Sequence, residues 1–212
     1  MERKEISKAV LKRLPGYLSY LKTMQPGASP YISATALANA LGMGEVQVRK
    51  DLAMVSDGGR PKIGYLRERL IDDLEQFLGY DNTTDAVLIG AGKLGQALLG
   101  YGGFDAYGLN ILAAFDANPA AEKTVDGKPI YPISQLEGFC KINKVLMGII
   151  TVPAEHAQSV CDQLIACGIK AIWTFAPTHL EVPEHILVQY ENMATSLAVL
   201  SMHLHAQIKE KK

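Results

Sequence analysis

The chain has 212 residues, of which 48% are hydrophobic, and 21 Lys and Arg nearly balance 22 Asp and Glu to give a net charge of −1. This length and composition support one large domain or two modest ones with hydrophobic cores. No apolar run reaches transmembrane length and the first residues do not resemble a signal peptide, so we expect a cytoplasmic protein with no membrane segment.

The cysteines do not form a metal-binding pattern. Cys140, Cys161 and Cys167 are odd in number and lack metal-ligand spacing. Because Cys161 and Cys167 lie in apolar segments, we expect buried, reduced thiols of a cytoplasmic protein. His203 and His205 do not face the same way on a helix. The sequence therefore predicts no metal site.

The two parts of the chain differ in charge. Residues 1–78 carry 12 Lys and Arg against 9 Asp and Glu, whereas residues 79–212 carry 9 against 13. A mildly basic N-terminal part joined to an acidic remainder is compatible with nucleic-acid binding, although a charge of this size proves nothing alone.

Short helices are expected in the N-terminal part. Apolar residues from Ile6 to Leu21 recur at helical spacing, and Pro15 predicts that this helix starts or kinks there. Ser33 is placed to cap a second short helix. After a glycine-containing turn, residues 45–55 predict a third helix, with Val46, Leu52 and Val55 on its apolar side.

Two short helices joined by a glycine-containing turn are typical of a helix-turn-helix. The helix at 45–55 would expose Gln47, Arg49 and Lys50. Glutamine can pair with adenine, arginine with guanine, and lysine with phosphate. An ordinary solvated helix face explains the same residues equally well.

The next segment favours DNA binding. Residues 56–64 form a glycine-rich basic loop with Arg60 and Lys62, where a winged helix carries its wing. Residues 65–78 then predict an amphipathic helix. A polar hinge follows, so we place a winged-helix domain at residues 1–79.

A glycine motif dominates the C-terminal part. The apolar run 86–89 ends at Gly90, Gly92 and Gly95, and a helical pattern follows. A strand, a tight glycine turn and a helix N-terminus can hold the pyrophosphate of a dinucleotide. A purely structural turn is the alternative. Asp116 favours the dinucleotide, because an acid about 20 residues beyond the glycines, at the end of a second strand, bonds the ribose of NAD and repels the 2′-phosphate of NADP.

Strands and helices alternate through the rest of this part. Strands are expected at 144–151, 171–176 and 186–190, with a short edge segment at 127–132 and helices at 134–141 and 154–167. This alternation predicts an α/β fold with a doubly wound, Rossmann-like parallel sheet at residues 80–190. The carboxyl ends of its strands would surround the nucleotide.

The final segment, residues 191–212, predicts a helix with a wide apolar stripe. We expect it to pack on another subunit of a homodimer. The chain shows neither a second domain for a substrate nor a histidine with a recognisable acid partner. A small NAD-dependent oxidoreductase is therefore the alternative, and a protein that senses the nucleotide is the leading hypothesis.

These motifs, taken in order, resemble the Rex family of redox-sensing transcriptional repressors. The resemblance rests on Gln-Val-Arg-Lys-Asp-Leu at 47–52, Gly-Ala-Gly-Lys-Leu-Gly at 90–95, Phe-Asp at 115–116, Val-Pro at 152–153 and Phe-Ala-Pro at 175–177. It implies a homodimer that exchanges its last helix, binds operator DNA and releases it when NADH is bound.

The resemblance also implies the site residues. The expected NAD(H) contacts are Gly90, Gly92, Lys93, Leu94, Gly95, Tyr101, Asp116, Thr151, Val152, Pro153, Phe175, Ala176 and Pro177. The expected DNA contacts are Gln47, Arg49, Lys50, Arg60 and Lys62.

The chain departs from the family pattern in the wing and at two charged positions. Ser19 stands where members usually carry Arg, and Asn192 where they usually carry Asp. In the family these two charges take part in the switch. Their joint replacement predicts weaker discrimination between NADH and NAD⁺ than in a typical member.

Overall fold

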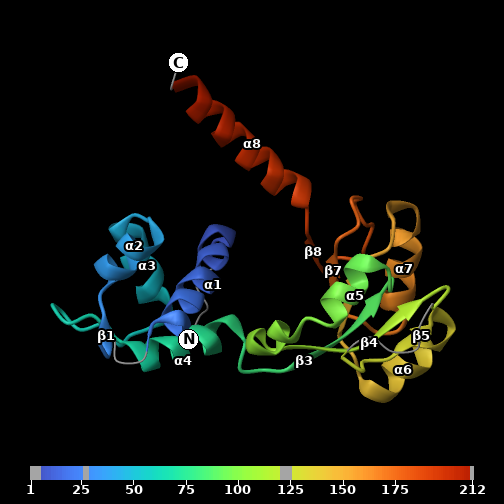
Figure 1. Ribbon diagram of the computed structural model, residues 1–212. Helices are drawn as coiled ribbons and strands as arrows, with labels where there is room; N and C mark the ends of the chain where they lie inside the picture. The colour runs from blue at the N-terminus through green and yellow to red at the C-terminus, as the bar shows by residue number, and fades with distance from the viewer. Residues whose placement is uncertain (1–5, 26–28, 120–125, 211–212) are drawn as a thin grey trace. The chain divides into compact units, whose positions relative to one another are not determined.

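The computed structural model describes residues 6–25, 29–119 and 126–210 (Figure 1). The chain divides into two compact units, Met1–Asn82 and Thr83–Lys212. The elements of the first unit are α1 (Lys8–Thr23), β1 (Tyr31–Ile32), α2 (Ala34–Leu41), α3 (Glu45–Val55), β2 (Tyr65–Leu66) and α4 (Arg67–Leu78).

The first helix begins earlier than the sequence predicts. Ser7 caps α1 by accepting a hydrogen bond from the N–H of Val10, and Pro15 lies inside the helix, so a start at Pro15 is wrong. Proline removes one helical hydrogen bond, but the apolar stripe of α1 is almost fully buried on both sides of it. Burial of this stripe outweighs the local helix-breaking tendency.

The helix-turn-helix is present as expected. Ser33 caps α2 by accepting from the N–H of Ala36 at 3.0 Å, and Gly42 ends that helix at a φ of 64°. Helix α3 spans the predicted residues, but its apolar side is different. Val46 is 64% exposed, whereas Val48 is fully buried together with Leu52. The prediction that Val46 faces the core is therefore wrong.

The fourth helix begins at Arg67, and the predicted start at Tyr65 is wrong. Tyr65 and Leu66 form β2, which pairs antiparallel with β1. This pairing takes both residues out of the helix and leaves the side chain of Leu66 40% exposed. Leu70 and Leu74 of α4 are fully buried against α1 and α3.

The second unit is a parallel sheet with helices on both faces. Its elements are β3 (Thr84–Ile89), α5 (Lys93–Leu99), η1 (Gly102–Tyr107), β4 (Leu109–Asp116), β5 (Ile130–Pro132), η2 (Ile133–Gln135), α6 (Leu136–Asn143), β6 (Met147–Ile150), α7 (Ala154–Ala166), β7 (Ala171–Thr174), β8 (Leu187–Tyr190) and α8 (Met193–Glu210).

The six parallel strands lie in the order β5-β4-β3-β6-β7-β8, and β5 is an edge strand as predicted. Counted within this sheet, that order is 3-2-1-4-5-6, the order of a dinucleotide-binding Rossmann fold. Its switch point lies between β3 and β6, where the glycine turn follows β3. Strands β6 and β7 are shorter than predicted, since apolar residues continue past both strands into the flanking turns.

Alternate residues of the strands pack on opposite faces. Val87 and Ile89 contact the core that contains α6 and α7, whereas Ala86 and Leu88 contact the core that contains Leu99 of α5. Every one of these strand residues is nearly or fully buried. The doubly wound arrangement expected from the sequence is therefore present.

The cysteines are free: Cys140 and Cys161 are buried and Cys167 is half-buried. Burial raises the pKa of Cys140 and that of Cys161 to about 11, which keeps both protonated and unreactive.

Helix α8 differs from the other long helices because the side chains described for it bury no face within the chain. The side chains of residues 194–209 are all exposed, and Leu197, Leu200 and Leu204 are 63%, 66% and 54% exposed. Within the described part of the chain, α8 and the other helices all lack the combination of length and apolar content needed to cross a membrane.

Candidate functional site

The three glycines of the turn after β3 have different structural roles. Gly90 has a φ of +103°, and a Cβ at Gly95 would lie 1.9 Å from the carbonyl oxygen of Gly90. The chain itself therefore requires glycine at these two positions. At Gly92 no heavy atom of the described residues lies within 4 Å of a Cβ. Packing within the chain therefore does not require glycine at this position, and a side chain there would extend into open space.

Two side chains from neighbouring strands fix this turn. Asp116, at the end of β4, accepts hydrogen bonds from the N–H of Ala91 at 2.7 Å and of Asn118 at 2.9 Å. The Thr151 hydroxyl, just beyond β6, lies 2.7 Å from the carbonyl oxygen of Gly90. The glycine turn is thus held from both sides at the switch point of the sheet.

A cavity of about 470 Å³ opens at this place. Six of the predicted residues line it: Gly90, Gly92, Asp116, Thr151, Val152 and Pro153. This is the size range of small-molecule sites, and its position matches the crevice where Rossmann folds bind nucleotides.

Sequence reasoning missed several polar residues of this cavity. They are Asn118, after β4, and His156, Ser159 and Gln163 of α7. The spacing from His156 to Ser159 and Gln163 places the three on one face of the helix. That polar face is visible in the sequence, but nothing in the spacing alone indicates that it lines a cavity.

The remaining predicted cofactor residues lie outside this cavity. Lys93 and Leu94 are exposed on the first turn of α5. Tyr101 packs edge-on against Phe104, with ring centroids 4.9 Å apart. Phe104 contacts Trp173, which contacts Phe175. Tyr101 and Phe175 are therefore joined through one aromatic cluster beside the sheet.

Ala176 and Pro177 line a second, smaller hollow of about 270 Å³. His179 stacks on Tyr190 there, with ring centroids 5.5 Å apart, and Glu191 and Asn192 complete the wall. Glu191 also accepts a hydrogen bond from the Trp173 indole at 3.0 Å. This hollow thus connects the aromatic cluster with the start of α8.

In the first unit, α3 exposes Gln47, Arg49 and Lys50 as expected. Arg49 pairs with Glu45 one turn earlier on the same helix. Arg60 and Gly64 exchange two backbone hydrogen bonds, of 2.8 and 2.9 Å, and so close the predicted wing loop into a tight hairpin. Lys62 sits at its tip with a φ of 66°.

A hollow of about 490 Å³ brings Arg49, Arg60 and Lys62 together. Gln47 and Lys50 are not among its lining residues. Ser33 and Thr35, from the start of α2, are part of the wall and were not predicted. Three cations beside a helix N-terminus form a surface suited to phosphate.

Each of the two units matches a known protein family. Residues 5–53 match a family described as "Putative DNA-binding protein N-terminus", and residues 81–178 match the CoA binding domain family. Curated relatives named redox-sensing transcriptional repressor Rex include proteins of Porphyromonas gingivalis (40% identity, 92% of this chain and 90% of the relative) and Clostridium botulinum (40% identity, 97% and 99%).

Solved structures of a similar protein, RSP, share this fold over almost the whole chain. The crystal structure of RSP in complex with β-NAD⁺ and operator DNA has a TM-score of 0.88 at 33% identity and covers 98% of this chain and 96% of RSP. The RSP complex with β-NADH has a TM-score of 0.85 at 33% identity and covers 99% of this chain and all of RSP. With curated relatives at 40% identity over more than nine-tenths of its length, this chain belongs to the Rex family of redox-sensing transcriptional repressors.

Proposed function

We propose that this protein is a transcriptional repressor that binds operator DNA through residues 1–79 and responds to NADH and NAD⁺ through residues 80–190. The observation that carries the proposal is Gly92, whose missing side chain faces open space at the N-terminus of α5. Backbone N–H groups exposed there suit a pyrophosphate. RSP, which shares the fold, has been solved with both forms of the dinucleotide.

The residues around the glycine turn fit the parts of NAD(H). The backbone of residues 90–95 would receive the pyrophosphate, with Lys93 and Leu94 at its helical edge. Asp116 accepts bonds from two N–H groups and keeps further lone pairs for ribose hydroxyls. The half of the cavity formed by Thr151, Val152, Pro153 and α7 would receive the adenosine side.

The nicotinamide end would lie toward the aromatic cluster. Tyr101 and Phe175 of this cluster, with Ala176 and Pro177 of the second hollow, would form its surroundings. The second hollow joins this region to the start of α8. A change in the nicotinamide can therefore be passed to the helix that we place at the subunit interface.

The surface of α3 and the wing would bind DNA. Gln47, Arg49 and Lys50 are exposed on α3, and Arg60 and Lys62 lie on the wing hairpin. RSP, similar over 98% of this chain, has been solved with operator DNA. We infer that α3 enters the major groove and that the wing contacts the backbone or the minor groove.

We also infer a homodimer in which α8 (within 191–212) packs on the partner subunit. Its apolar side chains are exposed in the chain, which is costly unless another surface covers them. A two-fold dimer presents two winged helices and so matches a palindromic operator. We infer that such a repressor acts in the cytoplasm.

We propose that the protein is not an enzyme and that the dinucleotide is a signal. Incubation with NADH and a panel of aldehydes and ketones, followed at the NADH absorbance, tests this. Unchanged absorbance supports a regulator. Steady NADH consumption would favour the small NAD-dependent oxidoreductase.

Ser19 and Asn192 support weaker discrimination between the two forms of the cofactor. Asn192 caps α8 by accepting from the N–H groups of Ala194 and Thr195 at 3.0 and 3.2 Å. Aspartate caps a helix equally well, so capping does not require the neutral residue. Calorimetric titration with NADH and NAD⁺ tests this, and a strong preference for NADH would contradict it.

DNA binding is tested by fluorescence anisotropy with a duplex that the protein selects from a randomised pool. Arg49→Ala should relax base preference, whereas Lys62→Ala should weaken binding to all sequences about equally. Affinity should fall steeply with salt because phosphate contacts release counterions. Unchanged duplex binding by Arg49→Ala would refute the assignment of α3.

A further inference from the structure

Glu191 lies between the end of β8 and the beginning of α8. Its backbone N–H donates to the carbonyl oxygen of Thr174 at 2.9 Å, and its Oε1 accepts from the indole of Trp173 at 3.0 Å. The amide nitrogen of Gln189 lies 3.4 Å from the same Oε1. Both the main chain and the side chain of Glu191 are therefore fixed to the sheet, one residue before Asn192 caps α8.

The partners of this carboxylate carry no charge. Its two hydrogen-bond donors, an indole and an amide, are neutral groups. Among residues 6–25, 29–119 and 126–210, no lysine or arginine forms an ion pair with Glu191. The half-buried carboxylate thus keeps a negative charge that these parts of the chain do not neutralise.

Glu191 belongs to the wall of the second hollow, together with two of the residues expected around the nicotinamide. Among the described residues that line this hollow, Glu191 is the only carboxylate. The other ionisable side chains there are those of His179 and Tyr190, which stack on each other. Trp173 connects the carboxylate with Phe175 of the aromatic cluster, with ring centroids 4.9 Å apart. A negative charge therefore lies beside the region that we propose for the nicotinamide.

The two forms of the dinucleotide differ in charge at the nicotinamide ring. The ring is positive in NAD⁺ and neutral in NADH, because reduction by a hydride removes the positive charge. A carboxylate near the ring attracts the oxidised form and has no comparable attraction for the reduced form. This attraction is stronger at a half-buried site than in bulk water, because the effective dielectric constant is lower there.

We propose that Glu191 is a specificity-determining residue that raises the affinity for NAD⁺ relative to NADH through the charge of its carboxylate. The hydrogen bonds to Thr174 and Trp173 hold this charge in place, whatever surface α8 packs on. The contribution is separate from that of Ser19 and Asn192, since it acts on the charge of the ring itself. The inference rests on the proposed function and on the proposed place of the nicotinamide.

The test is calorimetric titration of the full-length protein with NAD⁺, NADH and ADP-ribose, which lacks the nicotinamide. Glu191→Gln removes the charge but keeps an oxygen that can accept from Trp173. Glu191→Met removes the charge and this acceptor at similar side-chain length. The control variant, Glu184→Gln, removes an exposed carboxylate of the same unit that does not line the hollow. Urea unfolding checks that each variant is folded.

In Glu191→Gln, the ratio of the Kd for NAD⁺ to the Kd for NADH should rise about three- to tenfold, mainly because NAD⁺ binds more weakly. Glu191→Met should change this ratio by a similar factor, because the charge and not the hydrogen bond is responsible. The affinity for ADP-ribose should stay the same in both variants. Glu184→Gln should leave the ratio unchanged.

Several results would overturn the inference. Equal losses of affinity for all three ligands would show that Glu191 only supports the fold of the site. A ratio that changes in Glu191→Met but not in Glu191→Gln would assign the effect to the hydrogen bond with Trp173. An unchanged ratio in both, or an equal change in Glu184→Gln, would show that the carboxylate does not act on the ring. A folded wild-type protein that binds neither dinucleotide would refute the proposed function itself.

Discussion

The carboxylate of Asp116 accepts a hydrogen bond from the N–H of Ala91 at 2.7 Å, which ties the end of β4 to the middle of the glycine turn. Asp116 therefore has a structural role in addition to the expected contact with ribose. Because the same carboxylate shapes the turn, its charge and its hydrogen bonding must be separated by mutation.

Asp116→Asn removes the charge but keeps an oxygen that can accept from Ala91. NADH affinity should fall about tenfold, while NADPH affinity should change little or rise, because the repulsion of its 2′-phosphate is lost. Calorimetric titration with both dinucleotides measures this. Unchanged preference between NADH and NADPH would show that Asp116 does not face the ribose.

Gly92→Ala and Gly95→Ala form a matched pair on the same turn. At Gly95 the added Cβ meets the Gly90 oxygen at 1.9 Å, so the free energy of unfolding should fall by more than about 2 kcal/mol. At Gly92 the Cβ meets nothing in the described structure, so stability should change by less than about 1 kcal/mol. Dinucleotide affinity should nevertheless fall at least about tenfold.

Urea unfolding and NADH titration of both variants measure this contrast. Full NADH affinity in Gly92→Ala would mean that the open space at this glycine is not used by the cofactor.

Glu45→Gln should strengthen DNA binding. Glu45 pairs with Arg49 on the exposed face of α3, and removing that carboxylate frees the guanidinium and removes a negative charge near DNA. We expect affinity to rise about three- to tenfold at low salt, measured by anisotropy.

The control is Glu137→Gln, which breaks the corresponding exposed pair with Lys141 on α6, in the other unit. It should leave DNA affinity unchanged. Equal effects of the two substitutions would indicate a change in overall charge only.

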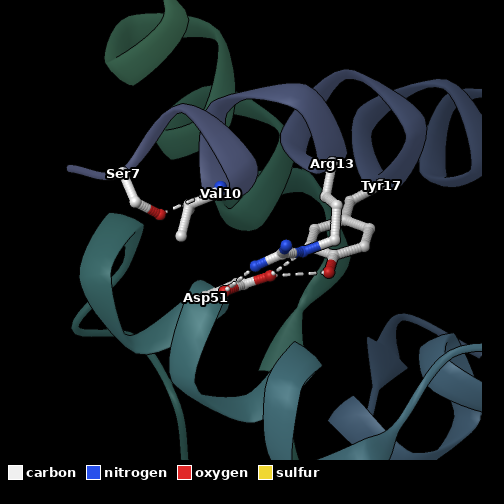
Figure 2. Close-up of polar contacts among 5 residues, drawn as sticks. All are labelled: Ser7, Val10, Arg13, Tyr17 and Asp51. Carbon is white, nitrogen blue, oxygen red and sulfur yellow. Dashed lines mark hydrogen bonds and ion pairs between the residues drawn. The ribbon is translucent and has the colours of Figure 1, made fainter.

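Tyr17 should make stability depend on alkaline pH. Burial, followed by its hydrogen bond to Asp51 (Figure 2), raises the pKa of Tyr17 to about 12. Between pH 10 and 12 the folded protein keeps a proton that the unfolded chain releases, so stability present below pH 10 is lost as the pH rises.

Urea unfolding of wild type and Tyr17→Phe across this range tests the effect. The difference between their free energies of unfolding should shrink by on the order of 1–2 kcal/mol from pH 10 to 12. A constant difference would contradict a raised pKa at this residue.

Local patterns in the sequence predict much of the fold. The glycine turn and the spacing to Asp116 give the switch point of the sheet, and Ser33 and Gly42 give the limits of α2. Errors arise where distant contacts override local preference. Pairing of β2 with β1 delays α4 to Arg67, and core burial carries α1 through Pro15.

The residues of the two candidate binding surfaces could be predicted from the sequence only in part. Contacts across long separations leave no local signal, and Trp173 and Glu191 are 18 residues apart. Likewise, the contribution of His156 and Gln163 to the cavity depends on how α7 packs on the sheet. Spacing along the chain does not contain that information.

In the proposed function, the redox state of the bound dinucleotide changes the affinity of this protein for DNA. The most direct measurement is the Kd for a selected palindromic duplex at saturating NADH and at saturating NAD⁺, at one fixed salt concentration. We expect weaker DNA binding with NADH, by at least about threefold, because coupling requires a difference in affinity between the two states. Identical Kd values with the two forms, both shown to be bound, would contradict it.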